Sequence, residues 1–235
     1  MSYKTFSIKG VHPGWNETFK NASVELAAID KILSKINSSI YPEKSDIFRA
    51  FNISPDDVKV VIFGQDPYPH MNRGSPTACG LAFSVRRKPK GYSKNSRDLP
   101  PSLVNIYKEI KNCYDDFVIP THGDISCWEK QGVMLLNRGL TYSNSHNKRT
   151  HSYLWAGFMD YVLTTLSIRS KECIYLLWGK EAEELASGIK GTQYITSHPS
   201  PRSVDRGFEG CEHFLKVNKR LANLGLEEID WTVPL

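Results

Sequence analysis

VVIFGQDPYPH, residues 60–70, joins a short apolar run to a turn that is crowded with polar side chains. Four consecutive large apolar residues, ended by Gly64, predict a strand that is buried on both faces. Gln65, Asp66 and Tyr68 follow in a turn that two prolines stiffen. We therefore expect a fixed carboxylate and a phenol at the carboxyl end of a core strand.

Three further apolar runs share these features, and helical patterns lie between the runs. The predicted strands are Val58–Gly64, Val133–Asn137, Cys173–Gly179 and Gln193–Ser197. The predicted helices are Ala22–Ile36, Ser45–Phe51, Leu103–Lys111, Trp128–Gln131, Leu154–Leu166, Glu181–Ser187 and Gly210–Leu224. This alternation predicts an α/β fold, a three-layer sandwich with a central four-stranded parallel sheet flanked by helices. No linker or repeat divides the chain, so we expect residues 1–235 to form a single domain.

Polar residues end or follow each of the four predicted strands. They are Asp66, Asn137, Lys180 and His198. In open parallel sheets, ligands bind in the crevice outside the carboxyl ends of the strands. We therefore expect these four side chains to surround one binding site.

The composition excludes several classes of protein. The chain of 235 residues is 40% hydrophobic and 23% charged, as in ordinary globular proteins. No apolar run approaches the length of a membrane span, and the N-terminal residues lack the pattern of a secretory signal. Its five cysteines are scattered and form no CxxC pair, which argues against a disulfide framework, a zinc site or an iron–sulfur cluster. We expect a reducing compartment, no metal and no cofactor.

The positive charge is concentrated in three stretches without aspartate or glutamate. These stretches are 67–97, 130–159 and 185–204, in a chain whose formal net charge is only +5. They contain Arg73, Arg86, Arg87, Lys88, Lys90, Lys94, Arg97, Arg138, Lys148, Arg149, Lys190 and Arg202. Each stretch alone is typical of a solvated loop, but three together indicate one positive face. Such a face attracts phosphates, so we expect a polyanionic partner.

The side chains of the candidate site each allow a structural and a functional interpretation. Asp66 could cap a helix, or it could orient a water molecule and stabilise a developing cation. Tyr68 and Phe83 could fill the core, or they could form a pocket wall and a surface that stacks on a base. Asn137 could satisfy backbone groups or read the edge of a base, and His198 could be structural or donate to developing negative charge.

Three serines allow a similar choice. Ser102 suits the N-cap of the predicted helix Leu103–Lys111, and it equally suits a contact with phosphate. Ser200 and Ser203 lie in a proline-stiffened loop and offer hydroxyls to phosphates.

Seven short motifs occur in order between Val60 and Trp231, over about three quarters of the chain. They are GQDPY, GLAFSV, PPSL-x-N-x-Y-K-E, LLN-x-x-LT, LLWG, HPSP-x-S-x-x-RGF-x-GC-x-HF and IDW. Together they resemble family 1 uracil-DNA glycosylase. The resemblance implies hydrolysis of the N-glycosidic bond of deoxyuridine in single- or double-stranded DNA, without metal or cofactor, as a step of base-excision repair.

The resemblance also implies a role for each matching residue. Gln65 and Asp66 would activate water, and Asp66 would also stabilise the oxocarbenium-like sugar. Tyr68 would exclude the methyl group of thymine, Phe83 would stack on uracil, Asn137 would bond its polar edge and His198 would donate to a uracil oxygen. The positions that would contact the DNA are Ser102, Lys180, Ser200, Arg202, Ser203 and Arg206.

The chain departs from the family pattern at three places. Pro69 is interposed before His70, and the following segment is longer than in the family. Lys180 replaces a serine that contacts the DNA backbone. Arg202 stands where the family inserts a leucine into the base stack; arginine can stack, but it is a poorer apolar wedge.

We expect an active, monomeric glycosylase, located in the cytoplasm of a bacterium or in the compartment that holds the DNA of a virus or eukaryote. Replication or repair proteins that bind it are not identified by the sequence. One alternative is a DNA-binding or replication-accessory protein with little catalysis, which would have no need of all four residues Asp66, Tyr68, Asn137 and His198. The other is a related nucleotide or base hydrolase, which the basic stretches and the serines disfavour.

Overall fold

The computed structural model describes residues 3–69, 71–72, 75–86, 99–144, 148–185 and 188–234. Side chains are described throughout these ranges except at 71–72, 75–76 and 148–150.

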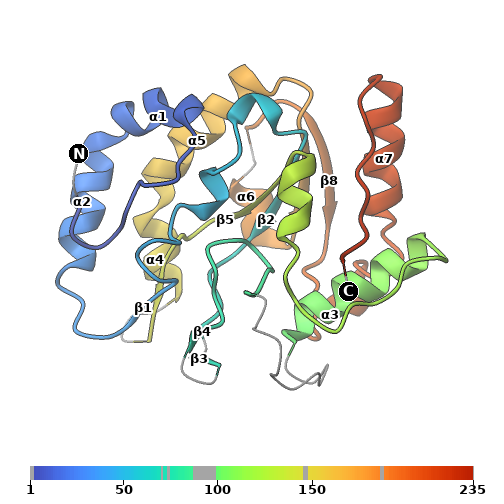
Figure 1. The fold of residues 1–235 in the computed structure, drawn as a ribbon, viewed down its shortest axis with the longest axis horizontal. Helices are drawn as coiled ribbons and strands as arrows, with labels where there is room; N and C mark the ends of the chain where they lie inside the picture. The colour runs from blue at the N-terminus through green and yellow to red at the C-terminus, as the bar shows by residue number, and fades with distance from the viewer. Residues whose placement is uncertain are drawn as a thin grey trace.

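A four-stranded sheet forms the centre of the molecule (Figure 1). Its spatial order is β5 (Val133–Asn137), β2 (Val60–Gly64), β7 (Ile174–Trp178) and β8 (Thr192–Thr196). All three neighbouring pairs are parallel. The predicted sheet is therefore confirmed, and each predicted strand is found within two residues of its expected ends.

The order of the strands places their carboxyl ends beside one another. β2 lies between β5 and β7, so the chain crosses from one side of β2 to the other after β5. Gly64 pairs with Asn137 at the ends of β2 and β5, and Trp178 pairs with Thr196 at the ends of β7 and β8. This reversal around β2 creates the crevice in which α/β proteins bind ligands.

Helices cover both faces of the sheet. They are α1 (Asn16–Asn21), α2 (Ser23–Leu33), α3 (Pro101–Cys113), α4 (Lys148–Leu154), α5 (Ala156–Arg169), α6 (Lys180–Leu185) and α7 (His213–Asn223). Single turns of 3-10 helix occur at Pro13–Trp15, Arg49–Phe51, Pro55–Asp57 and Val204–Arg206, and a longer one at Ser126–Gln131. α5 packs against α1 and α2, and α3 packs against α7, with the sheet between the two groups in Figure 1.

Several predicted helix boundaries are wrong. The predicted helix Ser45–Phe51 is helical only as a 3-10 turn at Arg49–Phe51. The predicted helix Leu154–Leu166 corresponds to α5, which begins at Ala156; Leu154 is the last residue of α4, which was not predicted. The last two positions of the predicted helix Glu181–Ser187 lie outside the described residues.

The last helix starts three residues later than predicted, at His213. Buried Glu109 of α3 accepts the backbone N–H groups of Gly210 (2.7 Å) and Glu212 (2.9 Å). Those amides are held by a carboxylate from another helix, and Glu212 adopts a left-handed conformation at φ 55°. The chain therefore bends before α7 and continues the loop that follows β8.

Two two-stranded sheets were not predicted. β1 (Ile40–Tyr41) pairs with β6 (Tyr142–Ser143), and β3 (Met71–Asn72) pairs with β4 (Ser75–Pro76). Strands of two residues are too short to produce a recognisable alternation of apolar and polar residues.

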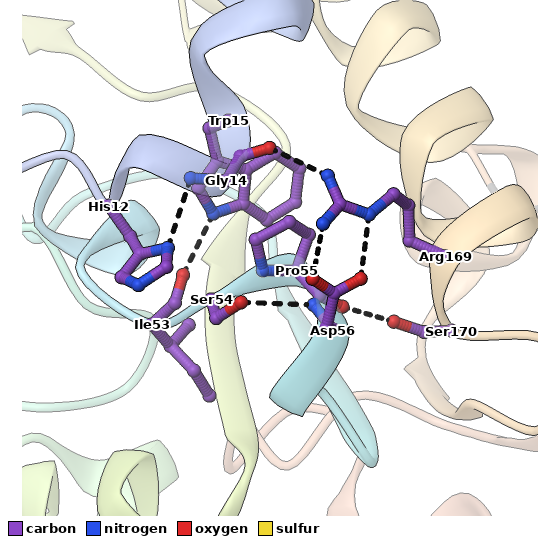
Figure 2. Close-up of polar contacts among 9 residues, drawn as sticks. All are labelled: His12, Gly14, Trp15, Ile53, Ser54, Pro55, Asp56, Arg169 and Ser170. Carbon is purple, nitrogen blue, oxygen red and sulfur yellow. Dashed lines mark hydrogen bonds and ion pairs between the residues drawn. The ribbon is translucent and has the colours of Figure 1, made fainter.

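Polar contacts hold together the segments at the amino ends of the strands, which is the edge of the sheet opposite the carboxyl ends (Figure 2). Arg169 at the end of α5 forms an ion pair with Asp56 and donates to the carbonyl of Gly14 at 3.0 Å. The hydroxyl of Ser170 donates to the carbonyl of Pro55. These contacts tie the N-terminal segment to α5 at a distance from the candidate site.

All five tryptophans are buried in one core with the strand residues. Within the described ranges, none of the helices combines the length and the apolar character that a membrane span requires.

Candidate active site

A cavity of about 140 Å³ opens at the carboxyl ends of β2 and β5. Seven of the predicted site residues line it: Gln65, Asp66, Tyr68, Phe83, Ser102, Asn137 and His198. The rest of its lining is Gly64, Pro67, Pro69, Ala78, Gly80 and Leu81. Segments that are far apart in sequence therefore meet around one small space.

The turn that carries Asp66 is fixed by the segment that follows β5. The backbone N–H of Arg138 donates to the carbonyl of Gly64 at 2.9 Å, and that of Gly139 donates to the carbonyl of Gln65 at 3.0 Å. Asp66 itself is half-buried, and its Oδ1 accepts a hydrogen bond from the hydroxyl of Ser152 at 2.9 Å. No helix begins at residues 67–69, so the helix-capping interpretation of Asp66 is wrong.

Asn137 lies on the floor of the cavity, with only 5% of its surface exposed. Its register partner on β2 is Gly64, and a Cβ atom at Gly64 would overlap Asn137 Oδ1. Glycine is required there for a steric reason, because only a residue without a side chain leaves room for the amide. The carboxamide is thereby held where it can both donate and accept.

Phe83 has an unusual backbone conformation, with φ at 61°. Bulky residues rarely adopt a positive φ, and such strain persists only where the surroundings enforce it. The phenol of Tyr68 donates to the carbonyl of Phe83 at 3.1 Å, and the Phe83 ring packs against Trp178 with centroids 5.5 Å apart. Burial raises the pKa of Tyr68 far above its usual range, so the phenol remains a neutral donor. Phe83 is part of the core, with 7% of its surface exposed, and it also lines the cavity.

His198 follows β8 and approaches Phe83, with ring centroids 5.8 Å apart. Its Nδ1 accepts the backbone N–H of Ser200 at 3.0 Å. An accepting Nδ1 carries no hydrogen, so the neutral ring carries its hydrogen on Nε2. This contact selects the tautomer that donates from the far side of the ring.

The loop after His198 is closed by its own serines. Ser203 Oγ donates to the carbonyl of His198 at 2.8 Å and lies 2.9 Å from Ser200 Oγ. Since Ser203 uses its one hydrogen on that carbonyl, Ser200 is the donor between the two hydroxyls. Asn105 of α3 secures the same loop by donating to the carbonyl of Pro199 at 2.8 Å. A contact of Ser200 or Ser203 with phosphate stays a prediction, and it requires one of these bonds to rearrange.

The remaining predicted DNA contacts lie outside the cavity or at its edge. Ser102 is the second residue of α3 and lines the cavity, whereas the N-cap of that helix is Pro100, so the N-cap interpretation of Ser102 is wrong. Lys180, Arg202 and Arg206 are exposed and do not line the cavity. Gln65 lines the cavity, and its amide nitrogen lies 3.5 Å from Glu181 Oε1.

Two of the cations in the acid-free stretches are paired with acids. Arg86 forms an ion pair with Asp46, and Arg138 lies 3.6 Å from Glu184 Oε2. Both pairs weaken the expected positive face. The expected cations Arg73, Arg87, Lys88, Lys90, Lys94 and Arg97 lie outside the described residues, as does His70, and the side chains of Lys148 and Arg149 are not described.

Metal ligands were not expected from the sequence. In the part of the chain that the structure describes, no group of three His, Cys, Asp or Glu side chains is placed to hold a metal ion.

Sequence reasoning missed three residues that shape the site. They are Ser152, whose hydroxyl contacts Asp66; Gly139, which packs against the same carboxylate; and Asn105, which holds the loop of His198. Asn105 is a fixed position of one of the seven motifs, which could have drawn attention to it, whereas Gly139 occupies a variable position inside another. Ser152 lies in no such motif, and nothing in its local sequence distinguishes it from a surface serine.

Comparison with known proteins identifies relatives over most of the chain. The family model described as "Uracil DNA glycosylase superfamily" matches residues 51–222. The uracil-DNA glycosylase of Francisella philomiragia is 41% identical, with 83% of this chain and 86% of the relative covered. That of Blochmanniella floridana is 43% identical, with 84% and 86% covered.

Solved structures agree in fold. The crystal structure of mimivirus uracil-DNA glycosylase has a TM-score of 0.83 and 26% identity, with 99% of this chain and 95% of that chain covered. A crystal structure from Nitratifractor salsuginis has a TM-score of 0.65 at 22% identity and covers 88% of this chain and 92% of its own, which supports the fold alone.

Proposed function

The chain belongs to the uracil-DNA glycosylase superfamily, and we propose that its strand-end cavity hydrolyses the N-glycosidic bond of deoxyuridine in DNA. The observation that carries this proposal is the meeting of Asp66, Tyr68, Phe83, Asn137 and His198 around one small cavity. A protein that only bound DNA would not need a carboxylate, an amide and an imidazole to converge there. The function includes the release of uracil as the first step of base-excision repair.

Recognition requires the base to leave the duplex, because the cavity is too narrow for paired DNA. Extruding one nucleotide costs a few kcal/mol, and least where the base is mismatched or single-stranded. In the cavity, uracil stacks on Phe83, and the Asn137 carboxamide bonds to its polar edge. Tyr68 fills the space that the methyl group of thymine would need.

Bond cleavage separates charge, and the cavity holds a group for each charge. As the bond between sugar and base breaks, its electron pair moves onto uracil and positive charge develops on the sugar. The Nε2–H of His198 donates to the uracil oxygen on which the negative charge collects. The carboxylate of Asp66 stabilises the sugar cation and accepts a proton from the water that adds to it, and that proton then leaves to the uracil anion or to solvent.

The exposed cations and serines serve the DNA backbone in this proposal. Lys180 and Arg206 are exposed outside the cavity, and Ser200 and Ser203 lie in the loop that follows His198. Ser102, in the first turn of α3, lines the cavity. Charged and hydroxyl side chains of this kind position the duplex without reading its sequence. We further propose that residues 1–235 act as one monomeric domain in the compartment that holds the DNA.

The direct test is an assay on an oligonucleotide with a single uracil, in the presence of a chelator. We expect release of free uracil and a strand that breaks only after treatment with alkali, since no step of the mechanism uses a metal. The matched substrate with thymine at the same position is the control. DNA that still contains its uracil after incubation would favour the accessory-protein alternative. Strand breakage without alkali would contradict a monofunctional enzyme.

Replacing Tyr68 with alanine should allow the enzyme to release thymine. The change opens the wall of the cavity and also removes the hydrogen bond to Phe83, so we expect uracil release to fall by about tenfold while thymine release becomes measurable. Tyr68→Phe is the matched control, because it keeps the ring and loses only the hydroxyl. Thymine should stay excluded in that variant. Continued exclusion of thymine by Tyr68→Ala would show that another group forms the wall.

Arg202 should matter much more on duplex DNA than on single strands. It is exposed on the loop that carries His198, near the expected path of the DNA backbone. A planar guanidinium can stack on the bases that flank the vacated position, and its charge near phosphates makes its contribution sensitive to salt. We expect Arg202→Ala to lower kcat/KM on duplex DNA much more than on single strands. Arg202→Leu should restore duplex activity with a shallower dependence on salt.

The measurement for Arg202 is the ratio of duplex to single-strand kcat/KM for the three proteins across a salt series. Equal ratios for the native protein and Arg202→Ala would leave Arg202 as an ordinary surface charge.

A further inference from the structure

Ser152 is bonded to the carboxylate at the centre of the site although it lies 86 positions further along the chain. Its hydroxyl donates to Asp66 Oδ1 at 2.9 Å, and only 8% of its surface is exposed. Hydrogen bonds to ionised acceptors are stronger than those between neutral groups. A buried hydroxyl placed on this oxygen is therefore a strong constraint on the Asp66 side chain.

The helix that presents Ser152 is itself fixed to the segment after β5. Thr141 Oγ1 lies 2.9 Å from His151 Nδ1, and it accepts the indole N–H of Trp155 at 2.8 Å. All three of these side chains are buried. Because His151 within α4 and Trp155 directly after α4 bond to the same threonine, the hydroxyl of Ser152 between them has little freedom to move away from Asp66.

Gly139 lies close to both the same oxygen and the Ser152 backbone. A Cβ atom at this position would lie 2.8 Å from Asp66 Oδ1, closer than Cβ atoms approach other atoms, and 3.3 Å from the Ser152 backbone, which is a tight contact. The backbone N–H of Gly139 meanwhile holds the carbonyl of Gln65. Asp66 Oδ1 therefore sits in a narrow space that the Ser152 hydroxyl and the Gly139 backbone both border.

We infer that Ser152 is a positioning residue for Asp66, which holds Oδ1 so that the carboxylate faces the cavity as an anion. The inference rests on the proposed function and adds a residue to it. A donated hydrogen bond favours the ionised carboxylate and reduces its basicity. Ser152 therefore supports stabilisation of the sugar cation more than it supports removal of a proton from water.

The first test is Ser152→Ala under single-turnover conditions on a uracil oligonucleotide. We expect the rate constant for uracil release to fall by about tenfold, as for the loss of one hydrogen bond to a charged group. Affinity should be unchanged for a duplex whose deoxyuridine carries a 2′-fluorine, which resists cleavage because the fluorine destabilises the sugar cation. A native rate in this variant would overturn the inference, and so would a loss confined to DNA affinity.

Two further variants separate positioning from general damage to the fold. Ser170→Ala removes the hydroxyl of a serine that is also 8% exposed and that donates to the Pro55 carbonyl at the opposite edge of the sheet (Figure 2). This control variant should leave the rate constant unchanged. Gly139→Ala crowds Asp66 Oδ1 and the Ser152 backbone, and it should lower the rate constant although the Ser152 hydroxyl is kept.

A double-mutant cycle gives the decisive result. If Ser152 acts through Asp66, Ser152→Ala should cost less than about twofold in the Asp66→Asn background, because the charge it holds is already absent. The same tenfold loss in both backgrounds would show that Ser152 acts on the fold and not on the carboxylate. If the native protein releases no uracil, the proposed function fails, whereas an active native protein with additive losses refutes only the role of Ser152.

Discussion

Replacing Asp66 with asparagine should lower the single-turnover rate constant for uracil release by about 10²–10⁴-fold. Asparagine has nearly the same shape, and its amide oxygen can still accept the hydroxyl of Ser152. The change removes the negative charge that stabilises the sugar cation. It also removes the carboxylate that accepts a proton from water. Affinity for uracil DNA should be nearly unchanged, because the cavity walls and the loop of His198 are not altered.

The control for this variant is Asp56→Asn, which removes a carboxylate at the opposite edge of the sheet (Figure 2). Its ion pair with Arg169 is exposed, so the thermal midpoint should shift only slightly and the rate constant should be native. Single-turnover cleavage by Asp66→Asn at the native rate would show that another group provides the negative charge.

Replacing His198 with asparagine should reduce the rate constant by about 10²–10³-fold. The side chain of asparagine can place its oxygen near the position of Nδ1 and accept the backbone N–H of Ser200, so the loop keeps its conformation. It cannot reach the position of Nε2, from which the neutral ring donates into the cavity. The variant therefore removes the donor to the uracil oxygen and leaves the local structure.

His198→Gln provides the matched comparison, because the longer side chain can place an amide N–H near the position of Nε2. We expect it to retain more activity than His198→Asn, while both variants bind the 2′-fluorinated duplex with native affinity. A larger loss in His198→Gln than in His198→Asn would mean that the contact with Ser200, and not the donor at Nε2, is what the reaction needs.

The central sheet was predictable because its signals are local. A short apolar run that glycine or a polar residue ends, such as Val133–Asn137, indicates a buried strand without reference to the rest of the chain. The residue at the end of such a run is then expected at the ligand-binding edge of the sheet. For this reason the amino-acid sequence was sufficient to assign Asp66, Asn137 and His198 to one site.

Two helix starts were predicted wrongly, one because a local signal was misinterpreted and one because of a distant contact. Ser102 resembles an N-cap in sequence, but α3 begins one residue earlier at Pro101, whose fixed φ suits the first turn of a helix. The helix predicted from Gly210 begins at His213, because Glu212 before it adopts a left-handed conformation while Glu109, about one hundred positions away, binds the backbone amides of Gly210 and Glu212. Pro101 is a local signal for the start of α3, whereas the start at His213 depends on a contact that the residues around it do not show.

The sequence by itself determined the strands, the identity of the groups at their ends and, through its motifs, the family. The tertiary structure decided the order β5-β2-β7-β8, the strained backbone of Phe83 and the contact of Ser152 with Asp66. The physical reason is the range of the interactions. Hydrophobic periodicity and turn chemistry act within a few residues, so a sequence displays them directly. A hydrogen bond between a helix and a strand end exists only after both have packed against the same core, and the position of each depends on all the others.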